Sequence, residues 1–218
     1  GTISRQFKTG MMGEGVLGFD EMNMSQSIVN HTTGSRAGTI LVNETVATQG
    51  QATITLDGLT SATTVTAGDV FTIAGVNAVN PQTRLSTGSL QQFVVTAAQT
   101  ASGGDMANMA ISPPMYTSSN ALATIDAFPA DNAAVTFVGT ASTAYPQNLV
   151  YHKNAITLAT ADLLLPQGVD MASRQVHNGI SMRIVRQYDI NNDRMPCRVD
   201  VLYGFNTIRP PMACRIWG

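Results

Sequence analysis

The chain has 218 residues, of which 44% are hydrophobic and only 12% are charged, and its formal net charge is -2. This length is enough for one large domain or two small ones with a real core. The low charge excludes the basic footprint of a nucleic-acid binder, and two cysteines are too few for a disulfide scaffold. Because no run of about 20 apolar residues exists, we expect no membrane span, and we expect no secretory signal. A surface so poor in charge predicts burial against partners or a cover of Thr, Ser, Asn and Gln.

The first 31 residues are rich in glycine and methionine, with five of the former and four of the latter. Glycine at this density breaks helices. We therefore expect loops and short strands that lie on another part of the protein. Because the chain begins with Gly1 rather than Met, we expect its start to be processed or to belong to a longer protein.

From residue 32 to residue 147 the composition shifts toward Thr, Ala, Val and Gly, and strand signals recur. Ala52, Ile54 and Leu56 alternate with polar residues, which is the period of a half-buried strand. Several short strands separated by Gly, Pro and Ser turns predict a small barrel or sandwich. Residues 117–127 are ambiguous between helix and strand. Further strands are expected at residues 39–42, 70–74, 90–97, 106–111 and 134–138.

The last third predicts a long antiparallel hairpin over residues 179–203, with turn-forming residues at 189–196. Its apolar face is expected to hold Cys197 and to be buried, so that Val201→Asp would unfold the protein by burying an unpaired charge. Its other face is expected to carry Arg183, Arg198 and Asp200. A short strand at 212–217 is expected to close the chain. The apolar face is predicted to hold Ile180, Met182, Ile184, Val199 and Val201.

Charge also separates the two regions. Residues 32–147 hold two basic and six acidic residues, and residues 148–218 hold eight basic and five acidic ones. The difference indicates two units with different surroundings. Neither 1–31 nor 148–218 is long enough to build a core alone, so we expect these flanks to form one unit. The predicted organisation is mainly β, with an inserted β-barrel at 32–147 between the two flanks.

Chemistry-bearing motifs are weak. Asp189, Asn191 and Asp193 match the first ligands of a calcium loop, but Arg194 stands where that loop needs Gly, so we predict a polar turn without metal. The three histidines, His31, His152 and His177, lack zinc-site spacing. Neither a nucleophile elbow nor a phosphate-binding loop is found. We therefore predict no catalytic, cofactor or metal site, and no enzyme.

Four segments, in order along the chain, resemble segments of tailed-bacteriophage major capsid proteins with the Hong Kong 97 fold. The resemblance is to the type that carries an inserted β-barrel, as in the coat protein of phage P twenty-two. In that family the first segment leads into the insertion, the second is a strand of it, the third returns from it, and the fourth is the closing strand. The segments are residues 15–34 (GVLGFD, then SQS and HTTG), 67–76 (AGDVFTIAGV), 147–159 (QNLVYHKNAITLA) and 198–209 (RVDVLYGFNTIR).

This resemblance implies a structural protein that self-assembles through pentamers and hexamers into an icosahedral phage head. It implies that the complete protein is α+β, with an arm, an extended loop and a spine helix in a part preceding Gly1. Scaffolding and portal proteins are the implied partners, double-stranded DNA is enclosed without sequence-specific binding, and assembly takes place in the host cytoplasm. The alternative is an extracellular β-sandwich binding or adhesin module. We predict that Trp217 at the chain's end is tucked against the core or a neighbour, since Trp and Arg are enriched at interfaces. The candidate subunit-interface residues are Arg183, Arg198, Asp200, Arg209, Arg215 and Trp217.

Overall fold

A computed structural model describes residues 11–16 and 19–217 of the chain. The chain divides into two units, residues 1–147 with 217–218, and residues 148–216. It therefore passes from one unit to the other twice, after Gln147 and after Ile216. Expectations for residues 1–10, 17 and 18 lie outside the described residues.

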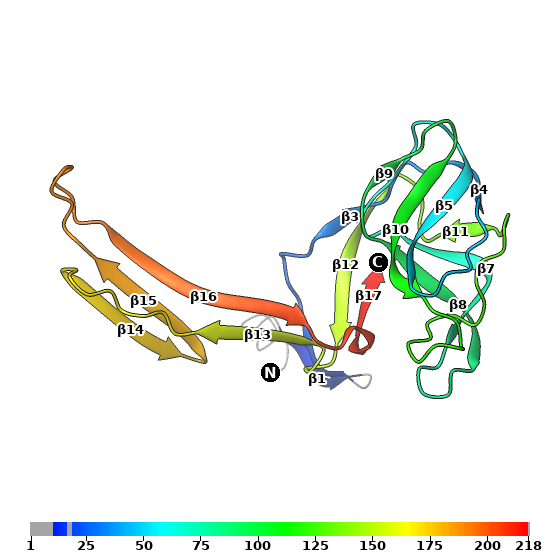
Figure 1. Ribbon diagram of the computed structural model, residues 1–218. Helices are drawn as coiled ribbons and strands as arrows, with labels where there is room; N and C mark the ends of the chain where they lie inside the picture. Colours follow the sequence, from blue (N-terminus) through cyan, green and yellow to red (C-terminus); the bar gives the residue numbers. More distant parts are fainter. Residues whose placement is uncertain (1–10, 17–18, 218) are drawn as a thin grey trace. The chain divides into compact units, whose positions relative to one another are not determined.

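The first unit contains a six-stranded antiparallel sheet that curls into a barrel (Figure 1). Its two edge strands meet, because Leu41 bridges Ala134 and the Val42 amide donates to the Ala133 carbonyl at 3.0 Å. These contacts nearly close the sheet and so leave little of its edges free. A separate two-stranded pair consists of β6 (Thr64–Val65), which follows β5 in the sequence, and β9 (Gln99–Thr100), which follows β8. The sheet order is β11 (Val135–Phe137), β7 (Val70–Val79), β8 (Ser86–Val95), β10 (Met106–Met115), β5 (Gln51–Leu59) and β4 (Gly38–Val42).

The barrel encloses an apolar core. Phe71 stacks on Phe93 with ring centroids 5.6 Å apart and lies 5.2 Å from the ring of Phe137. Ile54 and Leu56 are fully buried on the face that their alternation predicts, whereas Ala52 is exposed. Each fully buried side chain of this size contributes about 1.5–3 kcal/mol. The barrel is thus stabilised by side chains of its own strands.

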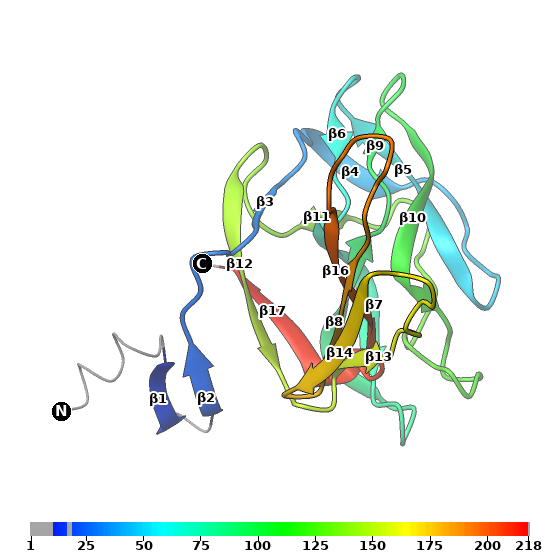
Figure 2. The same ribbon diagram turned by 90° about the vertical axis from the view of Figure 1, so that its left-hand side faces the viewer.

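Two smaller strand pairs precede and follow the barrel in the sequence. β1 (Met11–Val16) and β2 (Phe19–Asn23) form an antiparallel hairpin, drawn side by side in Figure 2. β3 (Asn30–Thr32) leads into the barrel and pairs with the start of β12 (Ala144–Tyr151), the strand that leaves it. The incoming and outgoing segments of the barrel are therefore neighbours, as an insertion requires.

The second unit is built on an antiparallel sheet in the order β13 (Ile156–Ala161), β16 (Cys197–Thr207), β15 (Ile180–Arg186) and β14 (Met171–His177). β14 and β15 join through Asn178 and Gly179, whose φ values of 49° and 78° suit a tight hairpin turn. After β16 come a 3-10 turn, η1 (Pro210–Met212), and β17 (Ala213–Trp217), which neighbours β12. The chain's final strand therefore starts at Ala213, one residue later than predicted.

The prediction of a mainly β chain is confirmed, because more than half of the chain is in strands and the described residues contain no α-helix. All the strands predicted in the barrel are present, but their limits differ. β5, β7 and β10 extend beyond the predicted residues, β8 begins four residues earlier and ends two residues earlier than predicted, and β11 is one residue shorter at each end. Residues 117–127 form turns, and Ile125 makes a single bridge to Ala78. The proposed boundaries at 31/32 and 147/148 stay predictions of domain organisation.

The hairpin has the predicted pairing but not the predicted burial. Met182 pairs with Val201, Ile184 with Val199, and Arg183 with Asp200, so the apolar and charged residues occupy opposite faces as expected. However, Val199 is 62% exposed and Val201 39% exposed, and Cys197 is exposed as well. Within this unit no chain segment covers the apolar face among the described residues, so Val201→Asp would not bury a charge here. The predicted burial of this face, on which the expected unfolding by Val201→Asp rests, is therefore wrong for this unit.

Candidate subunit interface

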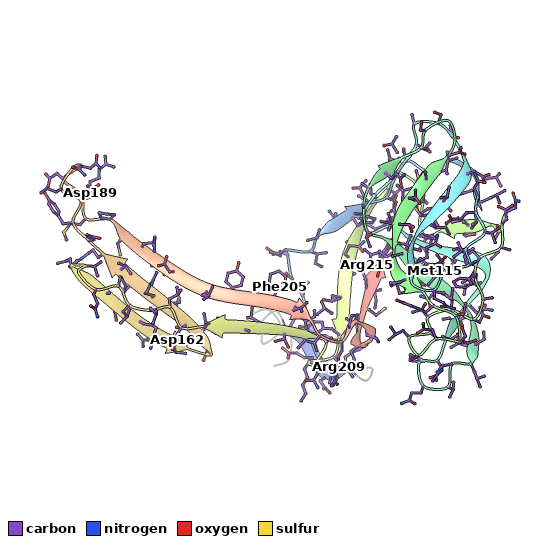
Figure 3. The ribbon with its side chains drawn as sticks, viewed as in Figure 1. Met115, Asp162, Asp189, Phe205, Arg209 and Arg215 are labelled. Atoms are coloured by element: carbon purple, nitrogen blue, oxygen red, sulfur yellow. The ribbon has the colours of Figure 1, made fainter. Side chains whose placement is uncertain are left out.

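One face of the second unit's sheet exposes a group of large apolar side chains to solvent, with the polar residues Gln175, His177 and Arg186 along its β14–β15 side, and we call it the apolar face. Strand alternation and the pairing register place its residues on the same side. Figure 3 shows the ring of Phe205 standing off the β16 ribbon, and this residue is 75% exposed. Soluble monomers seldom expose a contiguous apolar surface, and those that do use it to bind something. The exposed apolar residues of this face are Leu158, Met171, Ile180, Met182, Val199, Val201, Tyr203 and Phe205, and the less exposed Ile184 pairs with Val199 among them.

The opposite face of the sheet is polar and partly covered by the unit's own chain. Arg174 Nη1 donates to the Leu163 carbonyl at 3.4 Å, and Arg183 Nη1 donates to the Leu164 carbonyl. Ser181, which pairs with Val176 next to the Arg174–Arg183 pair on the same face, is only 5% exposed. The loop between β13 and β14 therefore lies on the polar face, which leaves the apolar face open.

Three predicted interface residues meet on this polar face. Arg183 Nε donates to Asp200 Oδ2 at 3.1 Å, and Arg198 Nε lies 2.8 Å from Asp200 Oδ1. The hydrogen bond from Arg183 holds the pKa of Asp200 below its ordinary value, and Arg198 acts in the same direction. Arg183 and Asp200 are largely buried side chains, whereas that of Arg198 is 72% exposed. The cluster fixes Arg183 within the chain and leaves Arg198 facing outward.

The other candidates lie elsewhere. Arg209 is exposed just before η1, where its amide donates to the Ala155 carbonyl at 3.2 Å. Figure 3 places Asp189 at the tip of the β15–β16 hairpin and Arg209 beyond the opposite end of β16. Arg215 is partly exposed on β17, and Trp217 belongs to the first unit. The structure thus brings Arg183, Arg198 and Asp200 together and leaves Arg209, Arg215 and Trp217 apart from them in sequence and strand.

The turn at 189–196 uses its polar groups internally. Asp189 Oδ1 accepts from the Asn191 amide at 3.0 Å, and Asp189 Oδ2 accepts from the Asn192 side chain at 2.7 Å. The hydrogen bond from Asn192 lowers the pKa of Asp189. Across residues 11–16 and 19–217, no group of three or more His, Cys, Asp or Glu side chains is placed to hold a metal ion.

A cluster of charged and hydrogen-bonded side chains lies where β3 enters the barrel and β12 leaves it, a region that we call the base of the barrel. This cluster was not predicted. Asp69 is fully buried; its carboxylate lies 3.0 Å from His31 Nε2 and 3.2 Å from Arg36 Nη1, and it accepts from the Gly34 amide at 3.1 Å. Burial alone would raise the pKa of Asp69, but hydrogen bonds from the Thr66 amide, His31 and the Gly34 amide, with the charge of Arg36, bring it below its ordinary value. His31 and Gly34 belong to the HTTG segment and Asp69 to the AGD segment, and the resemblance of these segments to the coat family was the available signal.

The fold and its exposed apolar surface indicate the class of protein, and the sequence profile then identifies the family. An exposed apolar sheet face beside a barrel with its own core is typical of a protein that works in contact with other protein. The sequence profile described as P22 coat protein, gene protein 5, matches residues 1–218. The chain belongs to the P22 coat protein family.

Comparison with solved structures finds similarity to the CUS-3 coat protein I-domain, at 27% sequence identity and a TM-score of 0.30. That alignment covers 52% of this chain and 98% of the other. A search of curated proteins found no match.

Family membership confirms the resemblance seen in the sequence and gives the chain a structural role in a phage capsid. It implies a non-enzymatic protein that forms shell oligomers and resides in the virion head. No described residue belongs to a helix long and apolar enough to cross a membrane. The family assignment leaves the adhesin alternative without support.

Proposed function

We propose that this chain is a shell-building part of a subunit that self-assembles, through pentamers and hexamers, into the icosahedral head enclosing double-stranded DNA. Scaffolding and portal proteins are its proposed partners, and the host cytoplasm its proposed site of assembly. DNA is enclosed without sequence-specific binding, which agrees with the acidic net charge of -2. Family membership supports the capsid role. Within this structure, the apolar face carries the proposal.

The apolar face supports assembly because its exposure is unfavourable in water. Transfer of apolar surface out of water contributes about 25 cal/mol per Å², and the side chains concerned include an exposed Phe205 and Tyr203. In the assembled head this face would be covered by protein, and its burial would stabilise the shell. Shell subunits make several heterologous contacts at once, so each one can be modest.

We also propose that residues 32–147 are an inserted domain and that residues 1–31 and 148–218 belong to the capsid core. Support for the insertion comes from the barrel core, whose buried apolar cluster extends from Val42 to Val135. The neighbouring β3 and β12 would serve as its incoming and outgoing strands. The proposed flanking core would contain the apolar face.

A pair of adjacent substitutions tests the role of the apolar face. Val201 and Leu202 are neighbours on β16 with similar exposure, 39% and 47%, and their side chains point to opposite faces. The full-length coat protein would be produced with its phage partners and viewed by negative-stain microscopy. We expect Val201→Asp to abolish closed heads and Leu202→Asp to retain them. Normal heads from Val201→Asp would contradict the proposal, as would equal loss of heads from both variants.

A further inference from the structure

Trp217, the penultimate residue, lies in the first unit, among residues from the two ends of the barrel insertion. Its indole stacks on Tyr145 with centroids 5.3 Å apart and an interplanar angle of 26°. The ring of His31 lies 5.8 Å away at an angle of 50°. His31 is on β3 and Tyr145 on β12, and the two residues are paired in register. Trp217 therefore contacts both strands by which the chain enters and leaves the barrel.

The two residues that contact the indole, His31 and Tyr145, each form a further hydrogen bond. His31 Nε2 lies 3.0 Å from the buried carboxylate of Asp69, which also pairs with Arg36. The Tyr145 hydroxyl accepts a hydrogen bond from the Thr140 amide at 2.9 Å. The Thr143 amide donates to Thr33 Oγ1 at 3.1 Å, which ties the outgoing segment to the incoming one. The indole therefore packs on a hydrogen-bonded base that spans both segments.

The space beside the indole is just large enough for a glycine. A Cβ added to Gly139 would lie 3.0 Å from Trp217 Cζ3 and 3.0 Å from Tyr145 Cε2, and the φ of Gly139 is 78°. Arg36 Nη2 donates to the carbonyls of Val138 and Gly139 at 2.7 and 3.0 Å, which holds this segment in place. A bulkier residue at 139 would therefore displace the indole or the Tyr145 ring.

We propose that Trp217 is a latch for the base of the barrel. With the indole seated between His31 and Tyr145, the end of the chain is anchored and the incoming and outgoing segments are held together. With the indole released, the segment around Thr140 opens while the barrel core stays closed, because that core is built from the barrel's own buried side chains. The latch is a conformational device of this chain and does not depend on the proposed assembly of the shell.

The chain offers a direct probe, since Trp217 is its sole tryptophan. Intrinsic fluorescence of the full chain therefore reports the seating of this one side chain. We expect emission at shorter wavelength and weaker acrylamide quenching in the native chain than in the chain unfolded in urea. Native quenching equal to that of the unfolded chain would overturn the proposal, because the indole would then be free.

A pair of glycine variants separates latch opening from general destabilisation. Gly139→Ala introduces a methyl group against the indole, whereas Gly75, with a nearly equal φ of 80°, has nothing within 4 Å of an added Cβ. Both variants strain the backbone in the same way. We expect Gly139→Ala to shift Trp217 emission to longer wavelength and increase quenching, and Gly75→Ala to leave both unchanged. Equal fluorescence of the two variants would refute the latch.

Amide exchange supplies a second measurement on the same two variants. In Gly139→Ala, the amides of Thr140 and Thr143 should lose protection, while those of β5 and β7 stay protected. This outcome would show local opening with a closed barrel. Loss of protection throughout the barrel, or unchanged protection at Thr140 beside a displaced indole, would each show that Trp217 does not act as a latch.

Discussion

The barrel sheet and the sheet of the second unit differ in the burial of their large apolar side chains. The barrel encloses its large apolar side chains, and its central residues, such as Phe71 and Ile73, have no exposed surface. In the second unit the large apolar residues of β16 are exposed, and Ala155 is the buried apolar residue there among those described. Similar strand patterns therefore produce a closed core in one region and an open face in the other.

This contrast teaches that alternation along a strand does not determine what covers the apolar side. The barrel strands curl until β4 meets β11, so that each apolar side chain faces another strand of the same sheet. The sheet of the second unit has the free edge strands β13 and β14, and its own loop lies on the polar side. A barrel can be stable alone, whereas an open sheet needs a second layer.

Excision of each region should give the largest difference. We expect residues 32–147, expressed alone, to fold, with slow amide exchange across β5 and β8, because the buried apolar cluster lies within these limits. We expect residues 148–216 alone to exchange fast, because their apolar face is uncovered. Hydrogen exchange by NMR measures both. Uniformly fast exchange in the barrel segment would break the comparison.

Alanine substitution of one phenylalanine in each sheet should show the same contrast in the free energy of unfolding. Phe71→Ala removes a fully buried ring that packs on Phe93 and Phe137, and should lower the unfolding free energy by about 3–5 kcal/mol. Phe205→Ala removes a ring that is 75% exposed, and should change it by no more than about 0.5 kcal/mol. Urea unfolding of both variants followed by circular dichroism provides the test. Comparable losses would mean that Phe205 is covered in solution.

Acid should affect the base of the barrel through Asp69. Its pKa in the folded chain lies below the ordinary value of 3.8, so the stability that its ionised form contributes is present above that value. This contribution is lost as the pH falls through the lower folded pKa. Asp69→Asn should cost about 3 kcal/mol at neutral pH, because it leaves buried Arg36 without its anionic partner.

The same variant should also show a weaker loss of stability below pH 4 than the wild-type chain. Urea midpoints measured from neutral to acid pH would show this as converging curves. Parallel curves would mean that Asp69 is not responsible for acid sensitivity. Asp131→Asn, at an exposed site of the same unit, is the control and should leave the curve in place.

Much of this architecture is readable in the sequence. Period-two alternation located the barrel strands and the hairpin, and it assigned Val199, Val201 and Asp200 to their correct faces. Local patterns suffice here because the facing of a side chain depends on its own strand. The resemblance of four segments identified the coat family, which the profile match confirms.

Other features depend on distant parts of the chain and were not predicted. The exposure of the apolar face depends on which loop crosses which side of the sheet, and no strand pattern contains that information. The hydrogen bond between His31 and Asp69 joins residues 38 positions apart, and Trp217 contacts His31 from the other end of the chain. Such clusters follow from barrel closure and chain return, both of which are non-local.

The smallest effect is expected at Arg198, and it separates folding from assembly. Arg198→Glu replaces one of the two guanidinium partners of Asp200 with a like charge two residues away on β16. Because Arg198 is 72% exposed and Arg183 still pairs with Asp200, the unfolding free energy should fall by only about 0–1 kcal/mol. The pKa of Asp200 should rise toward its ordinary value, because one of the groups that lower it is gone. Thermal unfolding and a carboxyl titration by NMR would measure these two changes.

Arg183→Gln is the matching variant, since it removes the less exposed partner together with the hydrogen bond to the Leu164 carbonyl. It should destabilise the unit more than Arg198→Glu does. If Arg198 faces a neighbouring subunit, as the sequence predicts, Arg198→Glu should lower the yield of heads in sedimentation while the chain stays folded, because charges across an interface chiefly set register and partner choice. Normal head yield from Arg198→Glu would confine Arg198 to its pair with Asp200. The polar side of the sheet would then contribute only to the fold, and the apolar face alone would remain as the assembly surface.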